Sequence, residues 1–126
     1  MTAAVLDTGA LIALERGDSR LWGVLAARAK AGGVVIVPTT ALAQAWRNGS
    51  RQAQLARALV HCEMASFDAL ARAVGELCGR ARTEDVCDAH VALVASRRAD
   101  ALYTSDPLDT RRLLRALDSD VAVIEC

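Results

Sequence analysis

The sequence has few aromatic residues, no long apolar run and no net charge. Aromatic residues make up 3% of the 126 residues, so side chains on which unpaired bases could stack are scarce. No apolar stretch approaches the roughly 20 residues that cross a bilayer. The first apolar run has no basic flank and is interrupted by Asp7, which argues against a signal peptide. We therefore expect a cytoplasmic protein with no membrane span.

Charge and cysteine content exclude further classes. A formal net charge of zero excludes the gross basic field of many nucleic-acid-binding proteins, although every basic residue except Lys30 is arginine. Arginine suits bidentate contacts to phosphate, but a codon bias explains the excess equally well. The four cysteines include no CxxC pair and no cluster with histidine, so neither a zinc site nor a disulfide framework is indicated. The sequence also lacks a P-loop, a GxGxxG motif and a recognisable Ser–His or Cys–His pair.

Apolar runs typical of buried strands alternate with helical patterns along the whole chain. Strands are predicted over residues 3–6, 34–37, 62–65, 101–104 and 121–124. Helices are predicted over residues 10–16, 20–31, 39–47, 51–60, 83–98 and 108–117, with one more beginning at Ser66. This order indicates an α/β fold with a mostly parallel sheet of about five strands and helices on both faces. No repeat or linker interrupts the pattern, so we expect a single domain spanning residues 1–126.

The first predicted strand ends on a carboxylate, in the segment Val5-Leu6-Asp7-Thr8-Gly9. Open α/β sheets place their functional side chains at the carboxyl ends of strands, just before the following helix. An aspartate at this position is also a good N-cap for that helix, and the residue alone does not decide between the two roles. Two further acids, Asp88 and Asp106, favour a shared site, because we do not expect all three to be caps.

Asp88 lies in a helical segment that is apolar nearly all round and should therefore be largely buried. A charged carboxylate without a partner would cost several kcal/mol there, so we expect it to be neutral, paired with arginine or bound to a cation. Asp85 and Glu84 precede it by three and four residues and lie on the same flank of the helix. Like charges raise one another's pKa and favour a metal ion that offsets them. A structural arginine pair and a metal site both remain open at this point.

Asp106 follows the strand that ends at Thr104. The Ser105-Asp106-Pro107 segment is also a common way to begin a helix, which by itself would explain the acid. In a parallel sheet, however, Asp106 emerges at the same edge as Asp7. A set of carboxylate oxygens selects a hard cation, Mg²⁺ or Mn²⁺, and such an ion activates water and stabilises charge developing on a phosphoryl oxygen.

These motifs together resemble the PIN-domain ribonucleases, specifically the VapC-type toxins of type II toxin–antitoxin systems. The matching segments are Val5 to Ala13, Asp85 to Leu93 and Thr104 to Pro107, in the order and with the intervening α/β pattern of that family. The resemblance implies a PIN-like three-layer α/β/α fold and metal-dependent endonucleolytic cleavage of RNA. It also implies a homodimer and a cognate antitoxin protein, a segment of which enters the acidic cleft.

The resemblance also assigns roles to individual residues. It implies that Asp7, Asp88 and Asp106 hold Mg²⁺ or Mn²⁺ as the catalytic acids, and that Thr104 supplies a supporting hydroxyl. Because Asp85 lies next to Asp88 in the matched segment, we include it among the candidate catalytic residues.

One position departs from the family. Its second acid, usually glutamate, lies on the helix after the second strand, where Gln44 is the nearest match in this chain. An amide oxygen can ligate a cation but brings no charge, so metal affinity should fall. We expect Asp85, or less favourably Glu84, to supply the missing charge from the neighbouring helix. The alternative is a catalytically weakened PIN-fold binding module, while a phospho-acceptor domain built on Asp7 is disfavoured because the one lysine, Lys30, lies at a helix end.

Overall fold

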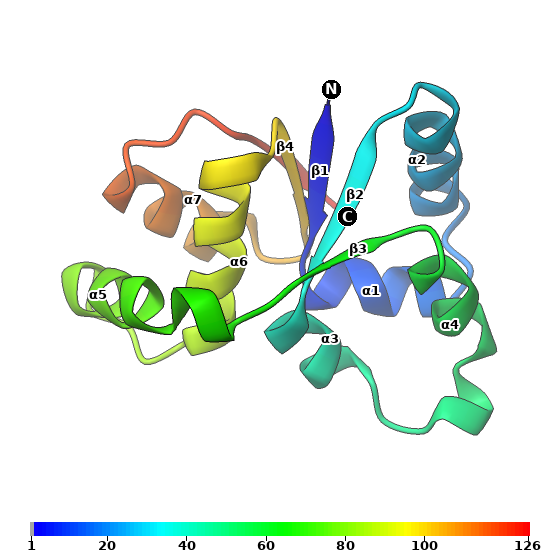
Figure 1. The fold of residues 1–126 in the computed structure, drawn as a ribbon, viewed down its shortest axis with the longest axis horizontal. Coiled ribbons are helices and arrows are strands. Elements are labelled where there is room, and N and C mark those ends of the chain that lie inside the picture. The colour runs from blue at the N-terminus through cyan, green and yellow to red at the C-terminus, as the bar shows by residue number, and fades with distance from the viewer. Residues whose placement is uncertain (1) are drawn as a thin grey trace.

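The sheet of the protein is parallel throughout. A computed structural model describes residues 2–126, and its strands are β1 (Ala3–Leu6), β2 (Val34–Pro38), β3 (Glu63–Ala65), β4 (Ala101–Thr104) and β5 (Ala122–Glu125). They form one sheet in the order β3-β2-β1-β4-β5, and every neighbouring pair is parallel (Figure 1). The predicted α/β class, with about five strands in a mostly parallel sheet, is confirmed.

Helices cover both faces of this sheet. They are α1 (Thr8–Glu15), α2 (Ser19–Lys30), α3 (Thr39–Ala45), α4 (Ala53–Leu59), α5 (Ala71–Ala81), α6 (Val86–Arg98) and α7 (Pro107–Ala116), with short 3-10 helices η1 (Gly49–Arg51) and η2 (Asp68–Leu70). Helices α1, α2 and α4 lie on one side and α5, α6 and α7 on the other, while α3 lies where β2 ends (Figure 1). Within residues 2–126, no helix has both the length and the apolar character needed to cross a membrane.

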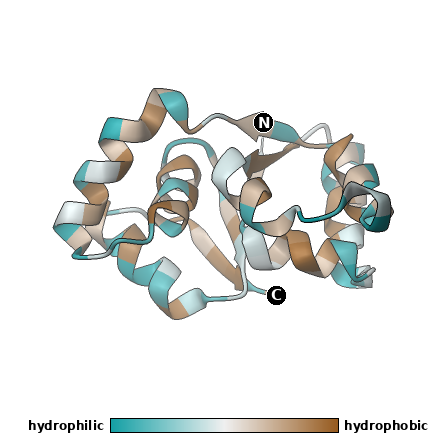
Figure 2. Ribbon diagram, turned by 90° about the horizontal axis from the view of Figure 1, so that it is seen from below, coloured by the Kyte–Doolittle hydropathy of each residue, from teal (hydrophilic) through white to brown (hydrophobic). Residues whose placement is uncertain are grey.

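The central strands are short and fully enclosed. Ala4, Val5 and Leu6 of β1 are buried, as are Val35 to Val37 of β2. Such strands read as continuous apolar runs because helices cover both of their faces. The strands in the interior are largely hydrophobic in Figure 2, whereas the outer helices alternate between hydrophilic and hydrophobic residues. Because these strands are buried along their length, they approach solvent only at their ends, where the residues that follow them lie.

Three predicted helices begin later in the structure, and α1 begins two residues earlier than predicted, at Thr8. The helix predicted from residue 51 begins at Ala53, because the Gln52 side chain accepts hydrogen bonds from the backbone N–H groups of Arg47 and Asn48 and so holds the preceding loop. The helix predicted from Ser66 begins only after η2. The helix predicted from residue 83 begins at Val86, because the side chain of Asp85 accepts a hydrogen bond from the backbone N–H of Asp88.

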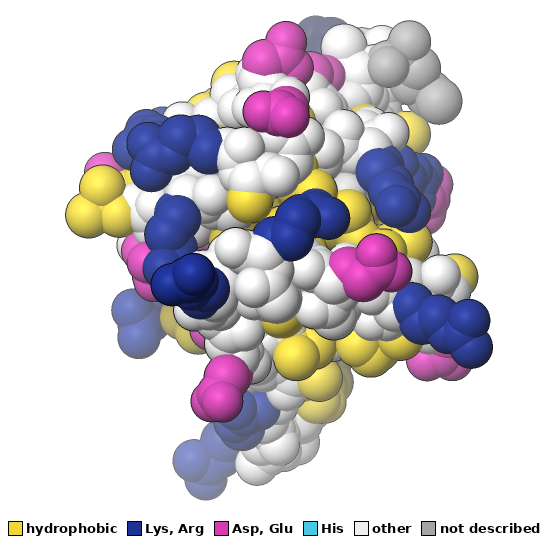
Figure 3. All heavy atoms as spheres, turned by 90° about the vertical axis from the view of Figure 1, so that its left-hand side faces the viewer, with side chains coloured by type: hydrophobic (Ala, Val, Ile, Leu, Met, Phe, Trp, Pro, Cys, Tyr) yellow, Lys and Arg dark blue, Asp and Glu magenta, His cyan; other side chains and the backbone are white. Residues whose placement is uncertain are grey.

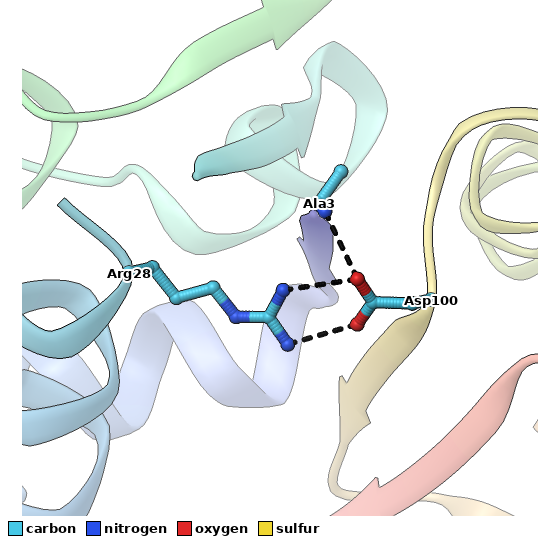
Figure 4. A network of polar contacts seen from close by, with 3 residues as sticks. All are labelled: Ala3, Arg28 and Asp100. Atoms are coloured by element: carbon cyan, nitrogen blue, oxygen red, sulfur yellow. Dashed lines mark hydrogen bonds and ion pairs between the residues drawn. The ribbon is translucent and has the colours of Figure 1, made fainter. Parts of the chain in front are cut away.

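An ion pair at the opposite end of the sheet joins α2 to the two central strands (Figure 4). The carboxylate of Asp100 accepts hydrogen bonds from Arg28 Nη1 at 3.3 Å and Nη2 at 3.0 Å, and from the backbone N–H of Ala3 at 3.1 Å. Hydrogen bonds from Arg28 hold the pKa of Asp100 below its usual range, so the contribution to stability is present at neutral pH and fades in acid.

We expect Asp100→Ala to lower the free energy of unfolding by about 1 kcal/mol at pH 7, since it removes charge-assisted bonds from a carboxylate whose side chain is 48% exposed. Urea denaturation at pH 7 measures this loss. The matched control is Glu63→Ala, which removes the more exposed pair with Arg98. Equal losses in the two variants would show that the bond to Ala3 adds nothing.

Candidate metal centre

Three of the helices that begin at the carboxyl edge of the sheet, α1, α6 and α7, have an aspartate as their N-cap, whereas α3, which also begins there, is preceded by Pro38. Asp7 Oδ1 accepts from the backbone N–H of Ala10 at 2.8 Å in α1. Asp85 and Asp106 accept in the same way at the starts of α6 and α7. Asp7 and Asp106 are therefore caps, a role that the sequence left open for both, whereas Asp88 is not, because Asp85 caps α6; the three acids are not all caps, as expected. A cap uses one carboxylate oxygen, so the second oxygen of each acid remains available for other contacts.

Carboxylates from α6 and α7 gather at this edge. One carboxylate oxygen from each of Asp88, Asp106 and Asp109 lies within 4.8 Å of the others. Asp88 and Asp106 are predicted site residues, whereas Asp109 is not among those predicted. The signal for it was the three-residue spacing from Asp106, which places both acids on one face of the first turn of α7.

Asp7 lies behind this cluster rather than within it. The residue is buried at the end of β1, and its charge is close enough to contribute to the raised pKa of Asp88. Its own pKa is raised by burial and lowered in turn by hydrogen bonds from the Thr104 hydroxyl and from backbone N–H groups. The structure thus brings Asp7, Asp88 and Asp106 to one edge, with Asp7 as the innermost acid.

Among the acids at this edge, Asp88 has the most strongly raised pKa. Burial, the charge of Asp85 and a hydrogen bond with it, and then the charges of Asp106 and Asp7 raise the pKa of Asp88 from 3.8 to about 7. The helix that carries Asp88 is largely buried, as expected, since Cys87 and the residues from Ala89 to Ala95 are buried. Asp88 itself is half-buried, because α6 begins only at Val86 and Asp88 therefore lies in its first turn.

No arginine neutralises these acids among the described residues. The ion pairs of residues 2–126 are Arg28 with Asp100 and Arg98 with Glu63, and neither is at this edge. The arginine pair that the sequence left open for Asp88 is therefore absent from this part of the chain. What offsets the repulsion in the structure is partial protonation of Asp88 and the positive ends of three helix dipoles.

Gln44 lies beside the acids but is already engaged. Its Oε1 accepts a hydrogen bond from the Thr8 hydroxyl at 2.8 Å. Gln44, Glu84 and Asp85 line one pocket of about 490 Å³, between α3 and the start of α6. The position of Asp85 therefore fits the expectation that it faces the same space as the residue at the second-acid position.

The donor set fits a hard divalent cation. Every candidate ligand is a carboxylate oxygen, which Mg²⁺ and Mn²⁺ prefer, and the three clustered oxygens are close enough to share one ion. Asp88, Asp106 and Asp109 could hold it directly, and the second oxygen of Asp7, which accepts from Ser105 N–H at 3.3 Å, lies on the inner side.

Arginine is abundant on the surface but not concentrated. On the side of α5 and α7, Figure 3 shows basic side chains scattered among acidic and apolar ones. Arg47, which follows α3, donates to the backbone carbonyls of Ala43 and Trp46 and so stabilises its own loop. The surface pattern agrees with the zero net charge and indicates no broad basic patch on the face shown.

Comparison with solved structures identifies the architecture. The chain is similar to a chain in the crystal structure of VapBC2 from Rickettsia felis bound to a DNA fragment from their promoter, with a TM-score of 0.73 over 98% of both chains. The fold is PIN-like. The predicted three-layer α/β/α arrangement is thus confirmed, while 17% sequence identity limits this likeness to the fold. No protein-family model and no curated protein matches the sequence.

We expect Asp88→Asn to stabilise the metal-free protein at pH 8. Because the pKa of Asp88 in the folded state lies above its ordinary value of 3.8, ionisation costs stability, and the cost grows as the pH rises from about 4 to about 7. Removing the charge should raise the Tm in EDTA by roughly 3 °C at pH 8, and by less at pH 5.

Thermal denaturation at the two pH values measures this effect, with Asp120→Asn as the control for loss of an exposed acid elsewhere. A gain in Tm that is the same at both pH values, or shared by the control, would contradict the strain assigned to Asp88.

Proposed function

We propose that the chain, as one PIN-like domain spanning residues 1–126, is a Mg²⁺- or Mn²⁺-dependent endoribonuclease and the toxin of a VapBC-type toxin–antitoxin pair. One observation carries the proposal: the clustered carboxylates of Asp88, Asp106 and Asp109, with Asp7 behind them, at the edge where three helices begin. Repulsion makes this arrangement unfavourable without a cation. The similarity in fold to the VapBC2 structure supports the same function.

In this proposal Asp7, Asp88 and Asp106 are the metal-binding and catalytic acids, and Asp109 joins them. The bound ion supplies an activated water and stabilises charge on the scissile phosphate. Asp106 and Asp109 are the exposed members that substrate reaches first, whereas Asp7 is held from inside by the backbone N–H groups of Ala10 and Ser105. Asp85 contributes charge to the pocket that it shares with Gln44.

An antitoxin protein and a second copy of the chain are the proposed partners, in the cytoplasm. Large apolar side chains are exposed after α3, after α4 and on β3, namely those of Trp46, Val60 and Met64. A groove of about 390 Å³ between α3 and α4 is lined by Leu42, Trp46 and Leu59 and is mostly apolar. Exposed apolar surface of this kind suits the aromatic or aliphatic anchors of a protein partner.

We expect the wild-type protein to cleave a mixed RNA pool with Mn²⁺ or Mg²⁺ and to lose this activity in EDTA. Asp7→Asn and Asp106→Asn should each lower the rate by at least about 100-fold, because each removes a carboxylate that holds the cation, and the cation is what offsets the charge of the transition state. Asparagine is as good an N-cap as aspartate, so both variants should keep the fold. Gel analysis of the RNA measures the rates.

The control for this experiment is Glu76→Gln, which removes an exposed acid of α5. Cleavage that persists in EDTA, or that Asp7→Asn leaves at the wild-type rate, would contradict a metal-dependent nuclease.

A second candidate function is a PIN-fold binding module with little or no cleavage. The observation that favours it is at Gln44, which brings no charge and whose amide oxygen is already used by Thr8. Gln44→Glu would restore the carboxylate that the family resemblance leads us to expect there.

The second acid can be tested with one set of variants. If Asp85 supplies the missing charge, Asp85→Asn should weaken Mn²⁺ binding about tenfold in titration calorimetry while keeping the cap of α6, and Glu84→Gln should not. We expect wild-type cleavage that Gln44→Glu changes little. A large gain in cleavage on Gln44→Glu would instead favour the binding module, and an unchanged Asp85→Asn would remove Asp85 from the site.

A further inference from the structure

A pocket of about 540 Å³ adjoins the metal centre on the side of α1. Two of its lining residues connect it to the innermost acid. Ser105 donates its backbone N–H to Asp7 Oδ2 at 3.3 Å, and Gly9 is the second residue after Asp7. A molecule bound at the acids can therefore extend past Ser105 into this pocket, whose volume is in the range of pockets that hold small ligands.

One face of α1 forms a wall of the pocket. The wall residues are spaced as i, i+3, i+4 and i+7 and so form one stripe along the helix, namely Gly9, Ile12, Ala13 and Arg16. The stripe leads away from Asp7 for about 10 Å, which is long enough for one nucleotide. Its middle is apolar, and the Ile12 side chain is 36% exposed, so an apolar surface is open to a ligand there.

Two charged side chains line the pocket at the end of this stripe. Arg16 follows α1 and takes part in neither of the ion pairs of residues 2–126. Asp18 is the N-cap of α2, and its Oδ1 accepts from the backbone N–H of Leu21 at 3.1 Å. The second oxygen of Asp18 remains available as an acceptor. The pocket thus combines an apolar wall, an unpaired guanidinium and a carboxylate that can only accept hydrogen bonds.

This combination matches one nucleotide of a single-stranded RNA. Proteins that read single-stranded RNA hold unstacked bases in pockets and bond to the edges of the bases. A guanidinium pairs with a phosphate through two parallel hydrogen bonds, and a carboxylate accepts from the exocyclic amino group of a base. Adenine, cytosine and guanine carry such an amino group. Uracil does not, and it presents a carbonyl oxygen on either side of its ring N–H, so a carboxylate repels it.

We propose that this pocket binds the ribonucleotide next to the scissile phosphate, with its base against Ile12 and bonded to Asp18, and its outer phosphate on Arg16. The RNA then crosses the edge of the sheet at Ser105, from the acids on α6 and α7 to the stripe on α1. Asp18 is the residue that determines the base, and it disfavours uracil. This inference rests on the proposed function, which supplies the RNA and its cleavage.

The base is tested by the pattern of cleavage. Wild-type protein and Mn²⁺ are incubated with a mixed pool of short single-stranded RNAs, and sequencing of the products gives the base on each side of the cut. At one of these two positions, uracil should be at least about tenfold rarer than the other bases. Asp18→Asn keeps the N-cap of α2, but its amide donates as well as accepts, so the bias against uracil should disappear. The matched control is Asp120→Asn, an exposed acid elsewhere, which should keep the bias.

The phosphate contact is tested by the dependence of cleavage on salt. Arg16→Gln should raise KM for RNA and leave kcat within about twofold, because Arg16 binds substrate without touching the acids. The slope of log kcat/KM against log KCl should become shallower by about 0.7, the contribution of one phosphate of a single strand. Arg72→Gln removes an exposed arginine of α5 and should keep the wild-type slope.

The outcomes separate this inference from the function on which it rests. Cleavage by the wild-type protein with no bias against uracil, or with the same bias in Asp18→Asn, would overturn the assignment of the base. An unchanged slope in Arg16→Gln would overturn the phosphate contact. Both variants would cleave as the wild-type protein does if a protein partner occupied the pocket instead. Absence of Mn²⁺-dependent cleavage in the wild-type protein would overturn the proposed function, and this subsite with it.

Discussion

Repulsion among carboxylates at one edge of the sheet is the constraint on which the structure of this edge depends. The parallel order of the strands places the end of β1 beside the end of β4, and the helices that follow begin there. Each helix start supplies backbone N–H groups and a positive dipole end, which make an acid tolerable. These contributions do not fully offset the repulsion at Asp88, and its pKa is therefore raised. At these residues, the negative charge that would bind a cation also lowers the stability of the metal-free protein.

The capping and site roles of the acids are compatible because an aspartate has two oxygens. In Asp7, Oδ1 begins α1 and Oδ2 faces the loop after β4. The cap holds the side chain in one rotamer, which is what a metal ligand needs if its orientation is to be fixed before the ion arrives. Fold and site therefore use the same hydrogen bonds, and a substitution that keeps the cap separates the two roles more cleanly than one that removes it.

The sequence predicted the strands to within one residue and the meeting of Asp7, Asp88 and Asp106 at one edge, since apolar runs and parallel topology determine both. It misplaced the start of α6, because Thr83, Glu84 and Asp85 are all plausible caps. Moreover, Arg82 ends α5 in a left-handed conformation (φ 55°) without the glycine that usually marks such an end. Asp109 could not be assigned, because its place beside Asp88 depends on the rotation of α7 about its axis against β4, and spacing alone does not give that angle.

The contact between Gly9 and Ser105 couples the two sides of the sheet. A Cβ atom at residue 9 would clash with the Ser105 hydroxyl, so the first turn of α1 and the loop between β4 and α7 are pressed together with no side chain between them. Neither can shift without displacing the other. Any molecule that presses on this loop from outside would therefore also displace the first turn of α1, which lies on the other face of the sheet.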